Sequence, residues 1–405
     1  MLLGALSAIP ALSIDLNLPA LPRLAAALGA APESAAATLS SFMAGFALAQ
    51  LLYGPASDRF GRRPVLLLSL ALHAIAGLAC ALAPSLSSLV AWRMLQGAGA
   101  SAGMVLSRAV VRDLFSDPVQ ARAQFSYLNA VGQVAPVIAP SLGSLVMVAT
   151  GGWRPIFVAL ALAGALLLIA TWVGLDESLP ATARDREALR PGRLLANYGH
   201  FLSLKSCLGN SLVAGCSFGC LFGFVSGSPL VFVAAFGFSL PAYAATFAGL
   251  SACIIAGSFG AAALARRRAP ARGAPRIALV CVCAGAAAGV GALSMPAPFP
   301  AAPALVVSLA VVTFCFGLVI PAVIQGALQP VPEMAGVGSA VLGCMQMLGG
   351  AVSSAVVGAL YGSLGAIAMP AVMLGFSLAA LAVQETVLRL SLLPDWQKRD
   401  PARTV

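Results

Sequence analysis

Long apolar stretches, each of about 20 residues and separated by short polar turns, constrain this sequence most strongly. An α-helix rises about 1.5 Å per residue, so such a stretch crosses a hydrocarbon core roughly 30 Å thick. Hydrophobic residues make up 60% of the chain and charged residues 9%, whereas soluble domains average about 25% charged residues. The sequence therefore predicts an all-α, polytopic membrane protein.

Twelve transmembrane helices are predicted in two sets of six. They cover residues 2–22, 38–56, 65–83, 86–108, 124–149, 154–175, 207–234, 241–264, 277–294, 302–325, 336–360 and 365–390. We expect an N-terminal bundle over 1–175 and a C-terminal bundle over 207–390. The polar stretch 176–206 indicates a cytoplasmic linker, and 391–405 a cytoplasmic tail. Two repeated halves around a midplane cavity are typical of transporters.

The basic residues cluster between alternate spans, and this clustering predicts the orientation. Lysine and arginine concentrate on the cytoplasmic side of membrane proteins. With both termini in the cytoplasm, the clusters at 59–63 and 266–276, the linker and the tail all fall on that side. Only Arg23 and Arg154 lie outside. The net charge of +10 sits in these short clusters, without a basic face interleaved with aromatic residues, so we expect no nucleic-acid partner.

Several other function classes lack support in the sequence. The nine cysteines lie in or beside apolar runs without the paired spacing of a metal site, and the chain has only two histidines. No His/Asp cluster, G-x-S-x-G motif or metal spacing lies near a membrane face, so nothing there indicates an enzyme. No segment outside the spans is long enough for the output domain of a receptor. We therefore expect a monomeric transporter with no metal and no cofactor other than a proton gradient.

Four short motifs occur in the N-terminal half. They are DLNLPALP (Asp15–Pro22), GPASDRFGRRP (Gly54–Pro64), WRMLQGAGAS (Trp92–Ser101) and GQVAPVIAPSLGS (Gly132–Ser144). Together they resemble the motifs of the bicyclomycin/chloramphenicol resistance (Bcr/CflA) branch of the drug:proton antiporters in the major facilitator superfamily. Asn17 replaces the usual tyrosine of that branch, and Ala135 and Ser144 replace glycines of the antiporter motif.

The resemblance implies two pseudo-symmetric six-helix bundles in a bacterial inner membrane. It also implies multidrug or antibiotic efflux by alternating access, in which a small organic compound is exchanged for protons. A transporter of the same fold for a cellular metabolite, such as a sugar, a nucleoside or an amino-acid-like compound, is the alternative.

The turn after the second span is expected to act as a gating latch. Its predicted members are Gly54, Asp58, Arg59, Gly61, Arg62, Arg63 and Asp113. We expect Gly54 to let two helices approach closely and Gly61 to permit a tight turn. The resemblance implies that Asp58 faces 336–339 in the outward-facing state and that Arg62 pairs with Asp113. If the turn only fixed the orientation of the chain in the membrane, this would explain the arginines but not Asp58.

Asp15 and Arg93 are the strongly ionisable residues predicted inside the spans. Each costs about 2.5–3.5 kcal/mol on insertion scales, so each calls for a functional explanation. We expect Asp15 to be the proton-coupling site, tuned by Arg93. A static ion pair between the two is the alternative. Arg93 is also expected to donate hydrogen bonds to backbone carbonyls freed near Pro19 and Pro22.

The fifth span is expected to be an antiporter-motif helix. Pro136 and Pro140 predict a bend, while Gly132 and Gly143 predict close packing against a neighbour. In the family that this sequence resembles, the motif marks antiporters. An ordinary kinked packing helix is the alternative.

Substrate is expected to bind between the halves near the midplane. The candidate cavity residues are Asn17, Phe46, Gln50, Asn129, Gln133, Phe218, Phe222, Phe314 and Gln346. Each could equally serve packing. Because helices seven to eleven carry no charge away from their ends, we expect a neutral or amphipathic organic substrate rather than a phosphorylated one, which would need an arginine clamp.

Overall fold

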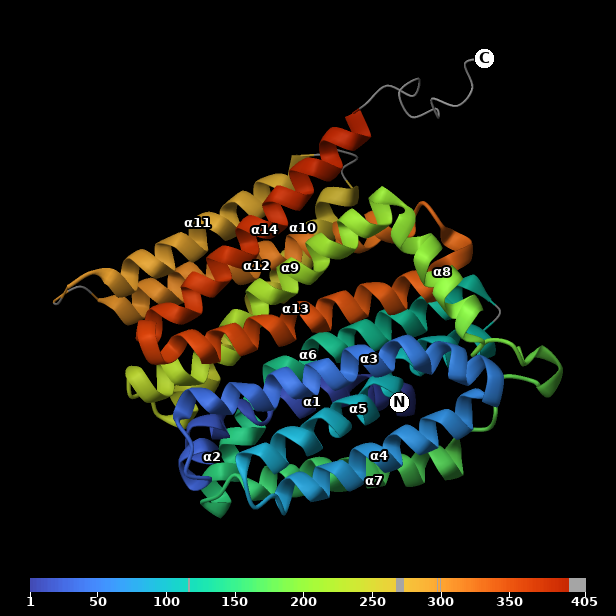
Figure 1. Ribbon diagram of the computed structural model, residues 1–405, viewed down its shortest axis with the longest axis horizontal. Coiled ribbons are helices and arrows are strands. Elements are labelled where there is room, and N and C mark those ends of the chain that lie inside the picture. Colours follow the sequence, from blue (N-terminus) through green and yellow to red (C-terminus); the bar gives the residue numbers. More distant parts are fainter. Residues whose placement is uncertain (116, 267–272, 297, 299, 393–405) are drawn as a thin grey trace.

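The computed structural model describes residues 1–115, 117–266, 273–296, 298 and 300–392, and all its regular structure within these ranges is helical (Figure 1). Beyond its first two positions, the predicted tail at 391–405 lies outside the described residues, as do Arg267, Arg268 and Arg272 of the predicted basic cluster.

The predicted twelve-helix architecture is confirmed, and each predicted span falls on a helical segment. The first six are α1 (Leu2–Asp15) with η1 (Leu18–Ala20) and α2 (Leu21–Ala27), then α3 (Ala36–Phe60) after η2 (Pro32–Ala35), α4 (Arg62–Ala81), α5 (Leu86–Leu114), α6 (Pro118–Thr150) and α7 (Arg154–Gly174). The linker holds η3 (Ala181–Ala183) and α8 (Pro191–Ser203). The last six are α9 (Lys205–Ser228) with the π-helix η4 (Pro229–Ala235), α10 (Leu240–Arg266), α11 (Ala274–Ser294), α12 (Ala301–Leu328), α13 (Ala335–Leu364) after η6 (Pro332–Met334), and α14 (Ala368–Leu392) after η7 (Gly365–Ile367).

Ten stretches of the described chain are long and apolar enough to cross a membrane, and the last of them contains both α13 and α14. The remaining long helix, α5, is less apolar because Arg93 and Gln96 lie in its middle. It nevertheless packs between α3 and α4, where both side chains are fully buried. The chain is thus a multi-pass membrane protein.

Small residues set the helix contacts within each set of six. A Cβ added at Gly45 or Gly97 would lie 1.9 Å from a backbone oxygen of the facing helix, so α3 and α5 are in backbone contact. The same contact recurs between α10 and α12, where a Cβ added at Gly257 or Gly317 would lie 2.0 or 2.2 Å from a backbone oxygen. The two sets therefore repeat one helix pairing.

The two ends of the molecule differ in character. One end, called here the arginine-rich end, carries the α3–α4 turn and α8, at the right of Figure 1. The opposite end, called the far end, carries α2 and η2. At the far end the two sets of helices are in contact, because η1 packs against η4 and α10, α2 packs against η4, and η2 packs against α13.

α3 and α13 run antiparallel along the interface between the two sets. Toward the far end, the Ser354 hydroxyl donates a hydrogen bond to the carbonyl of Ala36 (3.2 Å). Near the middle, a Cβ added at Gly343 would lie 2.0 Å from the amide nitrogen of Gln50. Continued by eight residues, this antiparallel register places Asp58 opposite the start of α13.

Beyond Gln50, a cavity of about 490 Å³ at the arginine-rich end is lined by residues of α3 and of the first turns of α13. We call it the basic-end cavity. Its lining includes Gln50, Gly54, Asp58, Arg62, Met104, Arg108, Arg112, Phe125, Arg193, Asn197, Tyr198, Glu333, Gly336 and Ser339. Asp58 and the first turn of α13 therefore share this cavity. The protein is closed at the far end and open at the arginine-rich end.

Candidate functional site

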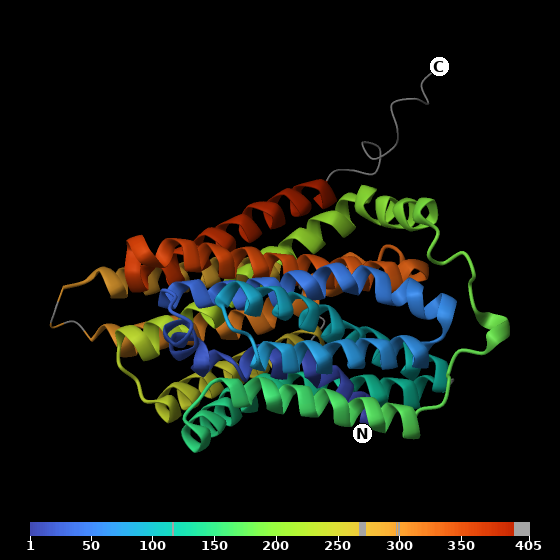
Figure 2. The ribbon, with the colours of Figure 1, turned by 60° about the horizontal axis from the view of Figure 1, so that its bottom comes forward.

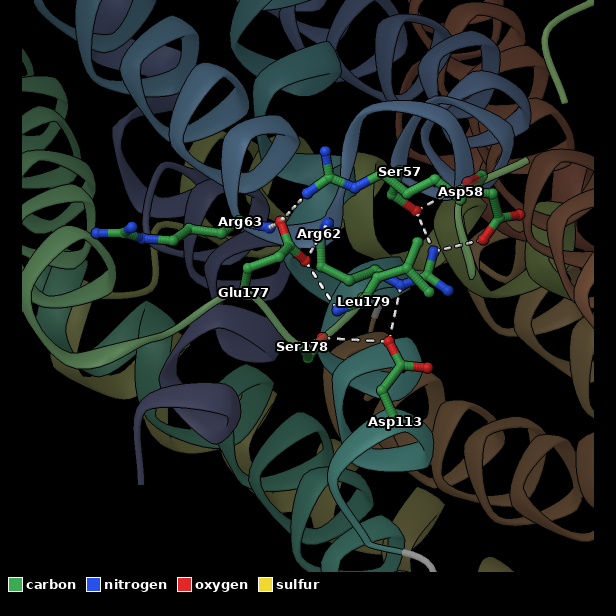
Figure 3. Close-up of polar contacts among 10 residues, drawn as sticks. Ser57, Asp58, Arg62, Arg63, Asp113, Glu177, Ser178 and Leu179 are labelled. Atoms are coloured by element: carbon green, nitrogen blue, oxygen red, sulfur yellow. Dashed lines mark hydrogen bonds and ion pairs between the residues drawn. The ribbon is translucent and has the colours of Figure 1, made fainter. Parts of the chain in front are cut away.

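Arg62 is the centre of a polar cluster at the turn between α3 and α4 (Figure 3). Its Nη1 donates to Asp58 Oδ1 (2.6 Å) and to Ser57 Oγ (2.5 Å). Its Nε donates to Asp113 Oδ2 (2.9 Å), so the expected contact between these two residues is present. Arg62 is only 4% exposed. A guanidinium offers several donors in a fixed fork, which lets this one side chain hold two carboxylates together.

Glu177 joins the same cluster from the linker (Figure 3). The linker leaves the end of α7 and runs up the right side of Figure 2 to α8. The Glu177 carboxylate accepts hydrogen bonds from the backbone N–H groups of Arg62 (2.9 Å) and Arg63 (3.3 Å). These are orphan donors at the start of α4, where negative charge is favoured. Gly61 has a φ of 102°, and a Cβ there would lie 2.3 Å from Glu177 Oε2, so the position requires glycine for two reasons.

A matching carboxylate occurs in the second set of helices. Glu385 on α14 forms an ion pair with Arg276 at the start of α11. In both sets, an acidic residue near the end of the sixth helix contacts the beginning of the third. The motifs do not include Glu177 or Glu385, because both contacts join helix ends that are distant in the sequence.

Besides Gly61, three members of the predicted latch form no bond to Asp58 or Asp113. Arg59 is exposed, with its guanidinium 5.2 Å from the centre of the Phe60 ring. The Arg63 side chain donates to the carbonyl of Trp172 (2.5 Å). A Cβ added at Gly54 would meet nothing within 4 Å, so the expectation that it brings two helices together is wrong for this conformation. The physical reason is the basic-end cavity, which Gly54 lines.

Arg93 is fully buried in the middle of α5. Its Nη1 donates to the carbonyl of Ser13 (3.1 Å) and to Gln96 Oε1 (2.8 Å), and its Nε donates to the carbonyl of Thr38 (3.4 Å). The guanidinium also lies over the ring of Phe42 at 4.3 Å. Arg93 therefore ties together α1, α3 and α5.

Two expectations about Arg93 are corrected by this geometry. No ion pair joins it to Asp15 within the described part of the chain, so the static bridge is absent in this conformation. The backbone oxygens that it binds belong to Ser13 and Thr38 rather than to residues near the prolines of the broken first span. Helix rotation, which sequence spacing does not fix, decides both contacts.

Asp15 is the last residue of α1, where the first span breaks. Pro19 and Pro22 are the second residues of η1 and α2, and neither can donate a backbone hydrogen bond that would continue α1. Asp15 is 6% exposed, and its carboxylate forms no hydrogen bond or ion pair with the residues that the structure describes. Asn17 beside it is fully buried, and both its amide atoms lack a described partner. Such groups are rare in folded proteins and call for an explanation.

The antiporter-motif helix α6 touches this break. A Cβ added at Gly143 would lie 2.0 Å from the carbonyl oxygen of Leu16, so α6 packs on the backbone next to Asp15. A Cβ at Gly132 would meet nothing within 4 Å, and the expectation that it allows close packing is wrong. Pro136 and Pro140 both lie inside α6, which continues through them as one helix.

Alanine substitutions at the two motif glycines are expected to have opposite effects. In Gly143→Ala the new methyl group must displace the backbone at Leu16, and overpacking of this kind costs about 1–3 kcal/mol. Gly132→Ala adds a methyl group in open space and gains helix propensity of about 1 kcal/mol. Thermal unfolding of the two purified variants measures the difference. Equal melting temperatures would contradict the packing described here.

The predicted cavity residues do not all meet in one place. Gln50 lines the basic-end cavity, and its Oε1 has no described partner. Phe125 lines the cavity too, and the spacing of four residues puts Asn129 and Gln133, both exposed, on the same face of α6. Phe46 is fully buried in the core instead.

The candidates on the second set of helices form an aromatic cluster with two outliers. Phe218 lies 6.2 Å from Phe222 and 5.3 Å from Phe316, measured between ring centres. Phe314 on α12 is 39% exposed, and Gln346 on α13 is half-buried. None of these five residues lines the basic-end cavity.

The basic-end cavity contains charged residues that the motifs do not include. Arg108 and Arg112 lie one turn apart on α5, and Glu333 lies just before α13. Arg193 on α8 forms an ion pair with Asp185 (2.6 Å). The cavity is thus more charged than expected. It reaches the loops where the basic clusters lie, whereas the expectation considered only the middle of the spans.

Comparisons with known proteins agree with this architecture. A family model described as Major Facilitator Superfamily matches residues 3–354. An uncharacterized MFS-type transporter of Bacillus subtilis (strain 168), YdgK, is 33% identical over 358 residues, which cover 88% of this chain and 87% of that protein. A bicyclomycin resistance protein homolog of Haemophilus influenzae is 34% identical over 235 residues, 58% of each chain. A solved bacterial homolog of the human lysosomal transporter Spinster, inward-facing and occupied, has a TM-score of 0.72 and 14% identity, and the match covers 99% of this chain and 97% of that one.

Proposed function

The chain belongs to the Major Facilitator Superfamily, a family of membrane transporters, and we propose that it exports small neutral or amphipathic organic compounds in exchange for protons. The observation that carries the proposal is Asp15, a buried carboxyl without a described partner at the break of the first span. The name of the bicyclomycin resistance homolog supports a drug-like substrate, over the 58% of that protein that the match covers.

The proposed site lies in a bacterial inner membrane with the arginine-rich end in the cytoplasm. This orientation follows the preference of arginine and lysine for the cytoplasmic side. The cavity at that end then makes the present conformation inward-facing. We also propose that the first bundle ends at residue 175 and that the second begins at residue 207.

In the proposed cycle, Asp15 changes its exposure as the two bundles rock. It lies next to the far-end contact of η1 with η4 and α10, which closes it off in the present conformation. When that contact opens, Asp15 would meet the external solution and take up a proton. When the far end closes again, substrate entering the open basic-end cavity would displace this proton to the cytoplasm. Arg93 on α5 donates a hydrogen bond to Ser13, two residues before Asp15 on α1, and would tune the site by its charge.

The latch would act at the other end of the molecule. A helix N-terminus carries roughly half a positive charge, which attracts a carboxylate. The register of α3 against α13 brings Asp58 to the first turn of α13 once the basic-end cavity closes. Asp58 would then exchange part of its contact with Arg62 for the start of α13, so the outward-facing state gains an interaction that the present state lacks.

A metabolite transporter of the same fold is the second candidate. Arg108 and Arg112 in the basic-end cavity favour it, since neither forms an ion pair among the described residues and both could hold a charged group of an amino-acid-like substrate. Efflux of neutral drugs does not require these two arginines.

Drug susceptibility with and without a proton uncoupler tests the proposal. Cells that express the protein should tolerate higher concentrations of several unrelated neutral or amphipathic antibiotics, and the uncoupler should remove this tolerance. Counterflow in vesicles with a drug panel and a metabolite panel separates the two candidates. Counterflow with metabolites alone would overturn drug export, whereas export that persists with the uncoupler would overturn proton coupling.

A further inference from the structure

A proline in α3 leaves one backbone carbonyl without its helical partner. Pro55 lies inside the helix and has no N–H, so it cannot donate to the carbonyl of Leu51 four residues earlier. The hydroxyl of Tyr198 donates to this oxygen at 2.6 Å from a position 147 residues away. Burial raises the pKa of Tyr198 to about 12, so the hydroxyl keeps its proton at neutral pH. A side chain of the linker thus supplies the bond that the proline removed.

The helix that carries Tyr198 is anchored to the second set of helices. α8 packs against α9 and α13. Phe201 is fully buried in a small cluster with Cys207, Val331 and Val341. A Cβ added at Gly338 would lie 2.7 Å from the Phe201 ring, which shows how closely α8 fits the first turns of α13. The bond from α8 to Leu51 therefore crosses from one set of helices to the other.

The same linker is also tied to the latch. The backbone N–H of Asp185 donates to the carbonyl of Asp58 (3.0 Å), and the Asp185 carboxylate pairs with Arg193 at the start of α8 (2.6 Å). Arg193 and Tyr198 both line the basic-end cavity. α8 therefore borders the cavity that must narrow when the arginine-rich end closes.

From these contacts we infer that Tyr198 is a positioning residue for the transport cycle, and that α8 is a strap that holds the arginine-rich end open. The bond from Tyr198 to Leu51 exists because α3 contains Pro55, and it ties α3 to α8, which packs on α13 beside the open cavity. Closure of the cavity would move α3 relative to α8 and break this hydrogen bond. The inference rests on the alternating access of the proposed function but not on the identity of the substrate.

Distances between spin labels at Arg59 and Glu333, both exposed, report on the width of the cavity mouth. The full-length chain would carry labels at these positions, with its native cysteines replaced, in lipid nanodiscs without substrate. A net hydrogen bond changes an equilibrium by a factor of about two to ten. Tyr198→Phe is therefore expected to lower the ratio of long to short distances by about that factor.

The decisive comparison is made in a protein that carries Pro55→Ala, because alanine restores the backbone N–H that donates to the Leu51 carbonyl. In that background Tyr198→Phe should leave the distance distribution nearly unchanged. Tyr53→Phe is the matched control, since the Tyr53 hydroxyl, on the same stretch of α3, makes no hydrogen bond to any described residue. It should not shift the distribution either.

Two results would overturn the inference. One is an unchanged distribution in Tyr198→Phe when Pro55 is present. The other is a shift of equal size in the wild-type and Pro55→Ala backgrounds, which would mean that the hydroxyl acts through something other than the freed carbonyl. The measurement uses no substrate. A failed drug assay would therefore count against the proposed function and leave the result on the strap intact.

Discussion

Asp15→Asn is expected to abolish transport driven by a pH gradient and to leave the protein folded. Asparagine has nearly the shape of aspartate but cannot exchange a proton. The Asp15 carboxylate has no described partner, so the substitution breaks no hydrogen bond or ion pair within the described chain. Gradient-driven transport in proteoliposomes should fall to the level of vesicles without protein.

The variant should still exchange substrate for substrate, because counterflow needs the rocking of the bundles but not a proton. Asp176→Asn is a suitable control, since Asp176 is exposed in the linker and forms no ion pair among the described residues. It should transport like the wild type. Loss of both activities together with a lower melting temperature in Asp15→Asn would indicate that Asp15 supports the fold instead.

Arg62→Ala is expected to destabilise the protein by about 3 kcal/mol and to reduce transport strongly. Breaking a buried ion pair by removing one partner costs about 3–5 kcal/mol, because the remaining charge is left unpaired. The Asp113 side chain is only 15% exposed, so it would lose its ion-pair partner without regaining full contact with water. We use the lower end of the range because the Asp58 side chain is 46% exposed and can regain water.

Arg59→Ala is the matched control for this prediction. It removes the same charge three residues away, from an exposed side chain that forms no ion pair among the described residues. Its melting temperature should stay within error of the wild type. Arg62→Lys should be intermediate, because a single ammonium group cannot hold both carboxylates as the guanidinium fork does. Equal melting temperatures for Arg62→Ala and Arg59→Ala would contradict the cluster of Figure 3.

The twelve helices could be predicted from the sequence because the length of an apolar run is a local property. The contact between Arg62 and Asp113 was expected from the resemblance of a short motif. Glu177 was beyond sequence reasoning, since its bonds to the start of α4 join two helix ends more than a hundred residues apart. The only sign of this contact in the sequence was an acidic residue just after the sixth predicted span.

The errors have two physical causes. Arg93 binds the carbonyls of Ser13 and Thr38 instead of Asp15, because helix rotation decides which atoms a long side chain meets. Gly54 and Gly132 have no neighbour at their Cβ positions, and a glycine alone does not reveal whether a second helix is close. Gly54 also lies beside a cavity whose width depends on the conformation.

The role of Tyr198 lies between these cases. The sequence shows that Pro55 leaves the Leu51 carbonyl free, since this depends only on a spacing of four residues. It does not show which donor fills the vacancy. That answer depends on where α8 packs, and α8 is placed by Phe201 against residues more than a hundred positions later in the chain.

Proton release on substrate binding tests the role of Asp15 most directly. The purified protein in weakly buffered detergent solution would receive a transported compound while a pH indicator records the change. If Asp15 holds the exchanged proton, the wild type should release protons and Asp15→Asn, binding the same compound, should release none. Equal release from the two proteins would show that the exchanged proton resides elsewhere.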